Sequence, residues 1–270
     1  MEFYEDAMAK TPPVRKQNLK NLDAIENLAG FKKLTNRIEH ARDLVDDEFV
    51  KYPETPGDWS RKLPVRMEEH LGRTLAGIQG NQSVYFGGTN KSFELDRFAG
   101  GGMSDLIVRD DRFAVLVEGA IYVDEGQYKE EIPPIVEHLK KAQRMIDDDH
   151  PVTDEKLVGV DHVFGLYVAP SYREKGIQEG LYEEVVSSCY DKLKNSTETP
   201  APIPMSVPQY KKVLQNFYDE DRSWKEFARD ITWLGEITKF TSDADQWGRI
   251  LDQYSKKGSS ILQDKTVYDL

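Results

Sequence analysis

The sequence predicts an α/β fold in which a mixed central sheet is flanked by helices. Short apolar runs of strand length alternate with longer segments of helical spacing, in the order helices, hairpin, helix, strand, helix, strand and helix. Two of the apolar runs are separated only by the charged turn Asp110-Asp111-Arg112, which is typical of a hairpin of antiparallel strands. The later runs are separated by helix-length segments, which are the crossovers that parallel strands require. This order of elements is that of an α/β sandwich.

Composition narrows the class of protein. The chain has 270 residues, of which 39% are hydrophobic, so one large domain, alone or with helical extensions, can bury a sizeable core. Cys189 is the single cysteine, which excludes an internal disulfide and a cysteine metal cage and favours a reducing, cytoplasmic compartment. No apolar stretch approaches the length of a membrane span, and the acidic first residues do not resemble a secretory signal, so we expect no membrane partner.

Helical extensions are expected at both ends of the chain. Apolar residues recur at helical spacing over 18–50, and Gly30 bends or breaks that run into two helices. Three prolines and a glycine make 51–64 typical of a linker. We therefore assign 1–64 to an N-terminal extension and linker. Residues 221–270 are assigned to a helical C-terminal extension, whose aromatic side chains are expected to pack in the core rather than stack on bases.

Residues 65–220 are expected to form the core. The expected elements are a helix over 65–78, a strand over 83–86, a glycine-rich loop over 87–103, hairpin strands over 105–109 and 113–119, a helix over 135–146, a strand over 162–168, a helix over 178–194, a strand over 202–205 and a helix that ends near residue 218. Pro133 and Pro134 suit the first turn of a helix, and Ser206 with Gln209 forms a capping box before the last one.

Two acidic residues lie at the ends of the two apolar hairpin strands. Asp105 opens the first strand and Glu118 closes the second, so a hairpin of this length can bring both carboxylates to the same edge. Burying a carboxylate is costly unless the group is paired or binds a metal. Mg²⁺ prefers carboxylate oxygens, and it can activate a water and stabilise a leaving oxyanion. The pair therefore predicts a site for Mg²⁺, with Mn²⁺ as an alternative, and metal-dependent hydrolysis of phosphodiesters.

The hairpin also carries a recognisable order of residues. Ser104-Asp105 stands where the PD-(D/E)xK nucleases have Pro-Asp, and Glu118-Gly119-Ala120 stands where they have Glu-x-Lys. The chain resembles these nucleases, and more closely the AlwI-like type IIS restriction endonucleases and related site-specific nicking endonucleases, which often carry Thr or Ser in place of the lysine. This resemblance implies a restriction-endonuclease-like core in which Asp105 and Glu118 are the metal ligands.

Three polar residues after the hairpin extend the resemblance. The group continues with a glutamine, a glutamate and a histidine nine, thirteen and twenty residues after the motif glutamate, and these offsets give Gln127, Glu131 and His138 here without gaps. The resemblance implies that these three residues join Asp105 and Glu118 in the catalytic site. The pKa of an ordinary histidine lies near neutrality, so His138 would act there as a proton donor or a phosphate contact.

Later elements continue the resemblance. The stretches 164–170 and 203–210 are similar to the next strand and helix of the family, so the resemblance covers about 65–217. It implies a Mg²⁺-dependent endonuclease that hydrolyses double-stranded DNA, as the cleavage subunit or module of a restriction system. Such enzymes usually need a second active site, so the implied partner is a second copy in a homodimer or a larger DNA-recognition subunit.

Two features favour an alternative. Ala120 has no polar group at the position of the motif lysine, and the formal net charge of −12 is unusual for a protein that grips DNA phosphates alone. A catalytically degenerate nuclease-fold protein, acting as a DNA-binding or assembly subunit, fits both observations. A repair or mobile-element nuclease of the same fold is a third interpretation.

Overall fold

The structure is a computed structural model, and it describes most of the expected core. The described residues are 67–68, 70–72, 74–80, 82–86, 104, 106–120, 125–147, 157–169, 181–193 and 202–258. Residues 1–66, the loop over 87–103 and Asp105 lie outside them, so the predictions made for these parts of the chain stay predictions. Among the described helices, none is both long enough and apolar enough to cross a membrane.

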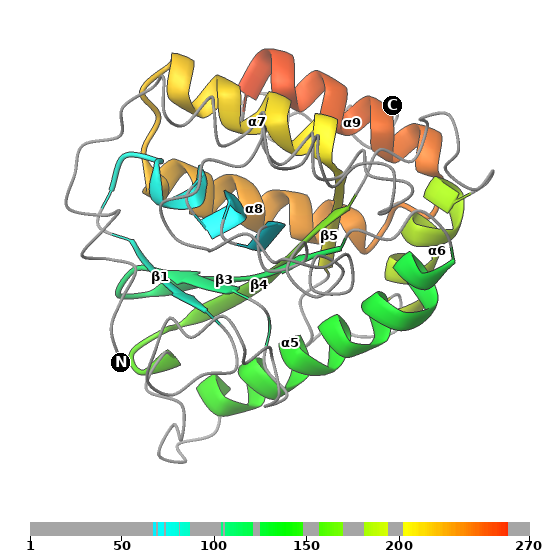
Figure 1. Cartoon of the computed structure of the whole chain (residues 1–270), viewed down its shortest axis with the longest axis horizontal. Helices are drawn as coiled ribbons and strands as arrows, with labels where there is room; N and C mark the ends of the chain where they lie inside the picture. The colour runs from blue at the N-terminus through cyan, green and yellow to red at the C-terminus, as the bar shows by residue number, and fades with distance from the viewer. Residues whose placement is uncertain are drawn as a thin grey trace, which may run out of the picture.

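Five strands form one sheet, and their order in the sheet is also their order along the chain (Figure 1). They are β1 (Ser83–Phe86), β2 (Leu106–Arg109), β3 (Phe113–Gly119), β4 (His162–Ala169) and β5 (Pro202–Ser206). β1 and β3 each pair antiparallel with β2, whereas β3, β4 and β5 pair parallel. The prediction of a mixed sheet, antiparallel at the hairpin and parallel afterwards, is confirmed.

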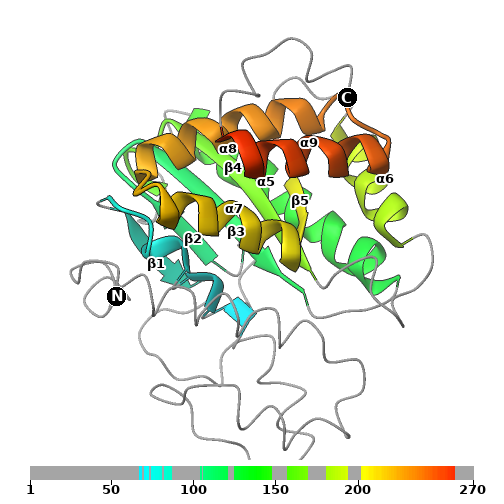
Figure 2. The ribbon, with the colours of Figure 1, turned by 90° about the horizontal axis from the view of Figure 1, so that it is seen from above.

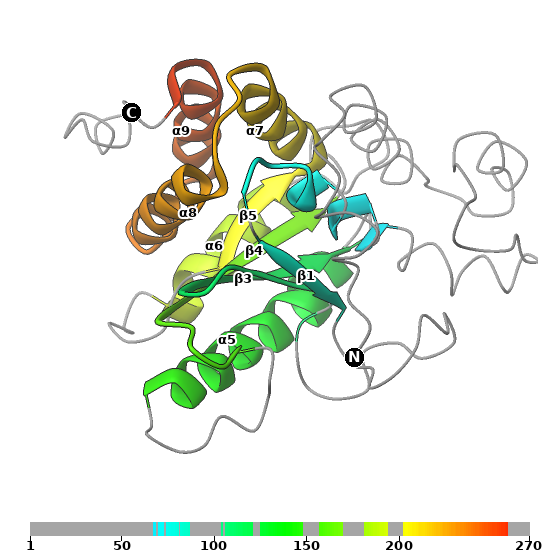
Figure 3. The same cartoon turned by 90° about the vertical axis from the view of Figure 1, so that its left-hand side faces the viewer.

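Helices cover both faces of this sheet (Figure 3). α5 (Ile132–Asp147) and α6 (Leu181–Leu193) lie on one face, and α7 (Val207–Asp219) and α8 (Trp224–Thr238) lie on the other, with α9 (Ala244–Lys257) beside α7. Figure 2 shows α7, α8 and α9 together over the same side of the sheet. The two layers bury the sheet on both faces, which is why its central strands are almost wholly apolar.

Alternation along β4 shows which helix covers which face. Gly165 faces Leu139 of α5, whereas the preceding residue, Phe164, faces Gly235 of α8. Phe164 also stacks on Phe113 of β3, with ring centroids 5.5 Å apart. Successive strand residues point to opposite faces, so these contacts place the α5 layer and the α8 layer on opposite sides of the same strand.

The helix after the hairpin begins earlier than the predicted range of 135–146. A π-helical turn, η2 (Gln127–Glu131), runs directly into α5. Pro133 and Pro134 lack a backbone N–H, so neither can donate the α-helical hydrogen bond to the turn before it. The polar sequence of η2 also lacks the apolar spacing of a helix, which is why only the later part was predicted.

Buried hydroxyl groups fasten the helical residues of 67–76 to α7. The Thr74 Oγ1 and Tyr210 hydroxyl oxygens lie 2.6 Å apart, and the Tyr218 hydroxyl donates to the Thr74 carbonyl oxygen at 2.5 Å. Burial raises the pKa of both tyrosines well above the usual value, so both keep their protons. The Gln82 side-chain amide donates to backbone carbonyls at the C-terminal end of the same segment.

Most of the described aromatic residues near the C-terminus pack in the core, as predicted. Trp224 and Trp247 are buried, and Trp224 stacks on Phe227 with ring centroids 5.1 Å apart. The indole Nε1 of Trp247 donates to the carbonyl oxygen of Pro204 in β5, at 2.8 Å. Trp233 and Phe240 differ, since they are 39% and 69% exposed. Large aromatic side chains therefore tie α8 and α9 to the core of the sheet.

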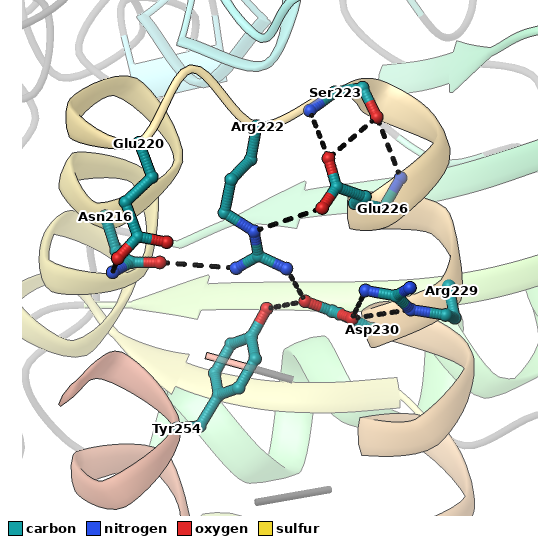
Figure 4. A network of polar contacts seen from close by, with 8 residues as sticks. All are labelled: Asn216, Glu220, Arg222, Ser223, Glu226, Arg229, Asp230 and Tyr254. Atoms are coloured by element: carbon teal, nitrogen blue, oxygen red, sulfur yellow. Dashed lines mark hydrogen bonds and ion pairs between the residues drawn. The ribbon is translucent and has the colours of Figure 1, made fainter. Parts of the chain in front are cut away.

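A buried carboxylate connects α7, α8 and α9 (Figure 4). Asp230 of α8 is fully buried, and its Oδ2 accepts from Arg222 Nη2 at 2.5 Å and from the Tyr254 hydroxyl at 2.8 Å. Its Oδ1 accepts from Arg229 at 3.2 Å. The Arg222 guanidinium also lies over the Phe217 ring, 4.0 Å from the centroid. Burial and the Asp230 charge raise the pKa of Tyr254 well above its usual value, so its hydroxyl stays a donor.

We predict that Asp230→Asn lowers the free energy of unfolding by about 3 kcal/mol, because it removes the nearer and buried of the two carboxylates that pair with the largely buried Arg222 guanidinium, leaving only Glu226 at 3.8 Å. Urea denaturation followed by circular dichroism measures this loss. The matched control is Asp252→Asn, which breaks the exposed pair with Lys212 and should change stability by less than about 0.5 kcal/mol. Equal effects of the two variants would contradict a structural role for the buried carboxylate.

Candidate active site

Glu118 is an acidic residue that the structure buries at the end of a strand. It precedes the last residue of β3, it is 5% exposed, and its Cα partner in β4 is Tyr167. Alternation places its side chain on the face of Leu116, which is the face that α5 covers. The fold therefore holds the Glu118 carboxylate, which is the predicted metal ligand, between the C-terminal end of β3 and helix α5.

His138 of α5 contacts this carboxylate directly. The distance between His138 Nδ1 and Glu118 Oε1 is 3.0 Å, and the His138 side chain is 18% exposed. A buried carboxylate needs a hydrogen-bond donor, and an imidazole that carries its proton on Nδ1 supplies one. The structure therefore brings together two of the five residues predicted for the site, one from β3 and one from α5.

Gln127 begins η2 and is fully buried. The Tyr167 hydroxyl donates to the backbone carbonyl oxygen of Gln127 at 3.1 Å. Since Tyr167 is the strand partner of Glu118, this bond ties the start of η2 to the sheet beside the carboxylate. Sequence reasoning missed Tyr167, although a tyrosine in a buried apolar strand is a signal that its hydroxyl has a partner.

Glu131 ends η2 and is half-buried. Burial, with a smaller contribution from the neighbouring Glu130 carboxylate, raises the pKa of Glu131 above its usual value. Glu131 and His138 are seven residues apart, about two helical turns, so they lie on the same side of the helix. The structure thus places Glu131 on the His138 side of α5, and its part in the chemistry stays a prediction.

The position of Asp105 is outside the described residues. Asp105 precedes Leu106, and Leu106 is the strand partner of Val117, which precedes Glu118. The predicted role of Asp105 as a metal ligand stays a prediction.

Ala120 follows the end of β3 and is buried. Its backbone N–H donates to the Val168 carbonyl oxygen at 3.0 Å, so the pairing with β4 continues past the strand end. Its side chain is a methyl group, which can hold neither a proton nor a phosphate. At this position the chain therefore lacks the ammonium group of the Glu-x-Lys motif, and His138 supplies a nitrogen at Glu118 from a different element.

The donor set at Glu118 suits a hard cation in part. A buried carboxylate offers the oxygen ligand that Mg²⁺ prefers, and Mg²⁺ needs only one or two protein carboxylates because it keeps several waters. Within the described ranges, no group of three or more His, Cys, Asp or Glu residues is arranged to hold a metal ion. A second carboxylate would have to come from elsewhere, and Asp105 is the residue predicted for it.

Comparisons with known proteins give matches among solved structures only. No family model and no curated protein matches the chain. The solved structure of R.BspD6I2, the small subunit of the heterodimeric restriction endonuclease R.BspD6I, matches with a TM-score of 0.48 and 14% sequence identity, over 83% of this chain and 98% of that chain. At this TM-score and identity, the likeness assigns neither a family nor an activity to the chain.

We predict that Glu131→Gln stabilises the protein at neutral pH. A raised pKa in the folded state means that the favourable contribution of Glu131 is present below its unfolded pKa and is lost as the pH rises through the folded pKa. Removing the charge should therefore raise the Tm by about 2 °C at pH 7. The Tm should stay unchanged at about pH 3.5, where the carboxyl is protonated in both states.

Thermal unfolding followed by circular dichroism at the two pH values measures this difference. Glu183→Gln is the matched control, because Glu183 is exposed on α6 and its variant should leave the Tm within about 1 °C at both pH values. A lower Tm for Glu131→Gln at pH 7 would contradict the prediction, because it would show that the folded protein favours the charged form of Glu131.

Proposed function

We propose that the chain is a metal-dependent endonuclease that hydrolyses phosphodiester bonds of double-stranded DNA. The observation that carries the proposal is the buried Glu118 carboxylate at the end of β3, bonded to His138 of the helix that follows. A carboxylate that pairs with a group able to exchange protons near neutral pH is an arrangement suited to hydrolysis. The order of Asp105, Glu118, Gln127, Glu131 and His138 along the chain, which resembles the AlwI-like group, supports the same proposal.

The proposed site divides the chemistry between carboxylates and an imidazole. Asp105 and Glu118 would hold Mg²⁺, or Mn²⁺ in its place, and the bound ion would supply Lewis-acid stabilisation and a water of lowered pKa. With Nδ1 of His138 engaged by Glu118, proton exchange with water or phosphate would take place at Nε2. Gln127 and Glu131 complete the proposed catalytic set.

The proposed partners follow from charge. A formal net charge of −12 disfavours tight binding to DNA by this chain alone, because phosphate contacts with Lys and Arg supply much of such affinity. We therefore propose that the chain is the cleavage subunit or module of a type IIS restriction or nicking system. A larger DNA-recognition subunit, or a second copy in a homodimer, would supply the remaining contacts.

A second candidate function is a catalytically degenerate nuclease fold that serves as a DNA-binding or assembly subunit. The specific observation in its favour is Ala120, whose buried methyl group stands where a lysine, threonine or serine is usual. The two candidates share a fold and differ in whether the site hydrolyses DNA, so a cleavage assay separates them.

We predict that the wild-type chain nicks supercoiled plasmid with Mg²⁺ or Mn²⁺ and is inactive with EDTA. Asp105→Ala and Glu118→Gln should each lower the nicking rate by at least about 100-fold, because each removes a proposed metal ligand. His138→Asn should lower it by about 100-fold, the usual effect of losing a proton-transfer group. Gel electrophoresis of time points measures the rates, with and without any co-encoded larger subunit.

Asp252→Asn is the control for that assay, because Asp252 is exposed on α9 and is not one of the residues of the proposed site. It should nick at the wild-type rate. Activity that survives both Asp105→Ala and Glu118→Gln would reject the proposed site. Nicking by Ala120→Lys alone would favour the catalytically degenerate alternative. No nicking by the wild type or by any variant would favour an assembly role.

A further inference from the structure

The distance between α5 and the sheet depends on a single glycine. Gly165 lies in the middle of β4 and faces α5, and an added Cβ would lie 2.6 Å from Leu139 Cδ1 and 3.3 Å from Leu139 Cδ2. The same Cβ would lie 3.2 Å from the backbone Cα of Pro202, the strand partner of Gly165 in β5. Leu139 therefore occupies the space that any other residue at position 165 would fill.

One of these neighbours is the end of a side chain and the other is backbone. Leu139 is fully buried among the core residues, and Pro202 Cα belongs to the backbone of a paired strand. Protein interiors are packed as densely as organic crystals, so an extra methyl group is accommodated by moving a helix or a strand rather than by filling a void. Carbon atoms pack at about 3.5–4.0 Å, so relief of the contact needs a displacement of about 1 Å.

Leu139 is the residue after His138, so a movement of α5 at Leu139 also moves His138 relative to Glu118. A displacement of α5 by about 1 Å would carry the Nδ1–Oε1 distance of His138 and Glu118 from 3.0 Å beyond the reach of a hydrogen bond. Gly165 and Glu118 lie on neighbouring parallel strands and on the same face, so both meet the same stretch of α5. How closely Leu139 packs on Gly165 is thus coupled to the distance between the Glu118 carboxylate and the His138 imidazole.

We propose that Gly165 is a positioning residue for the Glu118–His138 pair, because the absence of a side chain at 165 sets the depth at which α5 packs. The proposal rests on the proposed function for its catalytic consequence. Its structural content, the link between position 165 and the Glu118–His138 contact, stands whether or not the chain cleaves DNA.

The test uses the full-length chain with ¹⁵N-labelled histidine. The chain has five histidines, and the His138 signals are assigned by their absence from His138→Asn. Gly165→Ala should shift the His138 Nδ1 resonance from its wild-type value toward that of Glu118→Gln, in which the charged partner is removed. Gly165→Ala should also lower kcat for plasmid nicking by about 10–100-fold while KM stays nearly constant, since a misplacement of about 1 Å acts on chemistry more than on binding.

Gly235→Ala is the matched control. Gly235 lies in α8, and its added Cβ would lie 2.9 Å from Cδ1 of Phe164, the residue before Gly165 in β4. The variant therefore crowds the same strand from the opposite layer of helices. Both variants should lose stability to a similar extent, but Gly235→Ala should leave the His138 resonance at its wild-type position. A merely structural role for Gly165 would make the two variants alike.

A compensating change completes the design. Leu139→Ala removes the methyl groups that meet the added Cβ, so the double variant Gly165→Ala/Leu139→Ala should return the His138 resonance and kcat toward wild type. The double variant also provides the test if Gly165→Ala alone does not fold. An unshifted His138 resonance in Gly165→Ala, or a double variant that folds without any recovery, would overturn the proposal. A chain that never nicks but shows the predicted resonance shifts would reject the proposed function and retain the positioning role.

Discussion

The parallel pairing of β3 with β4 is the constraint on which the rest of the structure depends. Seven consecutive residue pairs join the two strands, from Phe113 with His162 to Gly119 with Val168. Parallel strands cannot be joined by a tight turn, so the chain must cross a face of the sheet between them. The crossover carries η2 and α5, and it starts at the end of β3, where Glu118 lies. The same constraint that orders the sheet therefore brings a helix back over the carboxylate.

The structure uses buried acidic groups in two different ways. Asp230 receives donors on both oxygens from two arginines and a tyrosine, which ties α8 to α9 and to the end of α7. At Glu118, a neighbouring group is the His138 imidazole, a type of side chain whose ordinary pKa lies near neutrality. The first arrangement suits stability and the second suits proton exchange. Burial does not distinguish the two arrangements, because both carboxylates are buried. They differ in the chemistry of the groups that contact each carboxylate.

Much of the fold could be predicted from local pattern, and less of the site could. Strand lengths, the charged turn and the first-turn prolines are local signals, so the mixed sheet and its helices were within reach of the sequence. The turn at 127–131 was not, because its polar residues carry no apolar period. Glu118 was predicted from its place at the end of an apolar strand and His138 through resemblance, whereas their contact depends on how α5 packs on the sheet, which is a tertiary property. Tyr167 was missed for the same reason.

The connection between β3 and β4 also has a consequence for the order in which the protein folds. The hairpin of β2 and β3 closes over a three-residue turn, and hairpins form in about 1–10 μs. The pairing of β3 with β4 must wait until the chain between them, with η2 and α5, has been brought back to the sheet, and non-local pairings are slow because loop closure comes first. Glu118 thus belongs to an early, local unit, and His138 joins it only with the later, long-range one. Contact between the two requires that α5 has packed on the face of the sheet that carries Glu118.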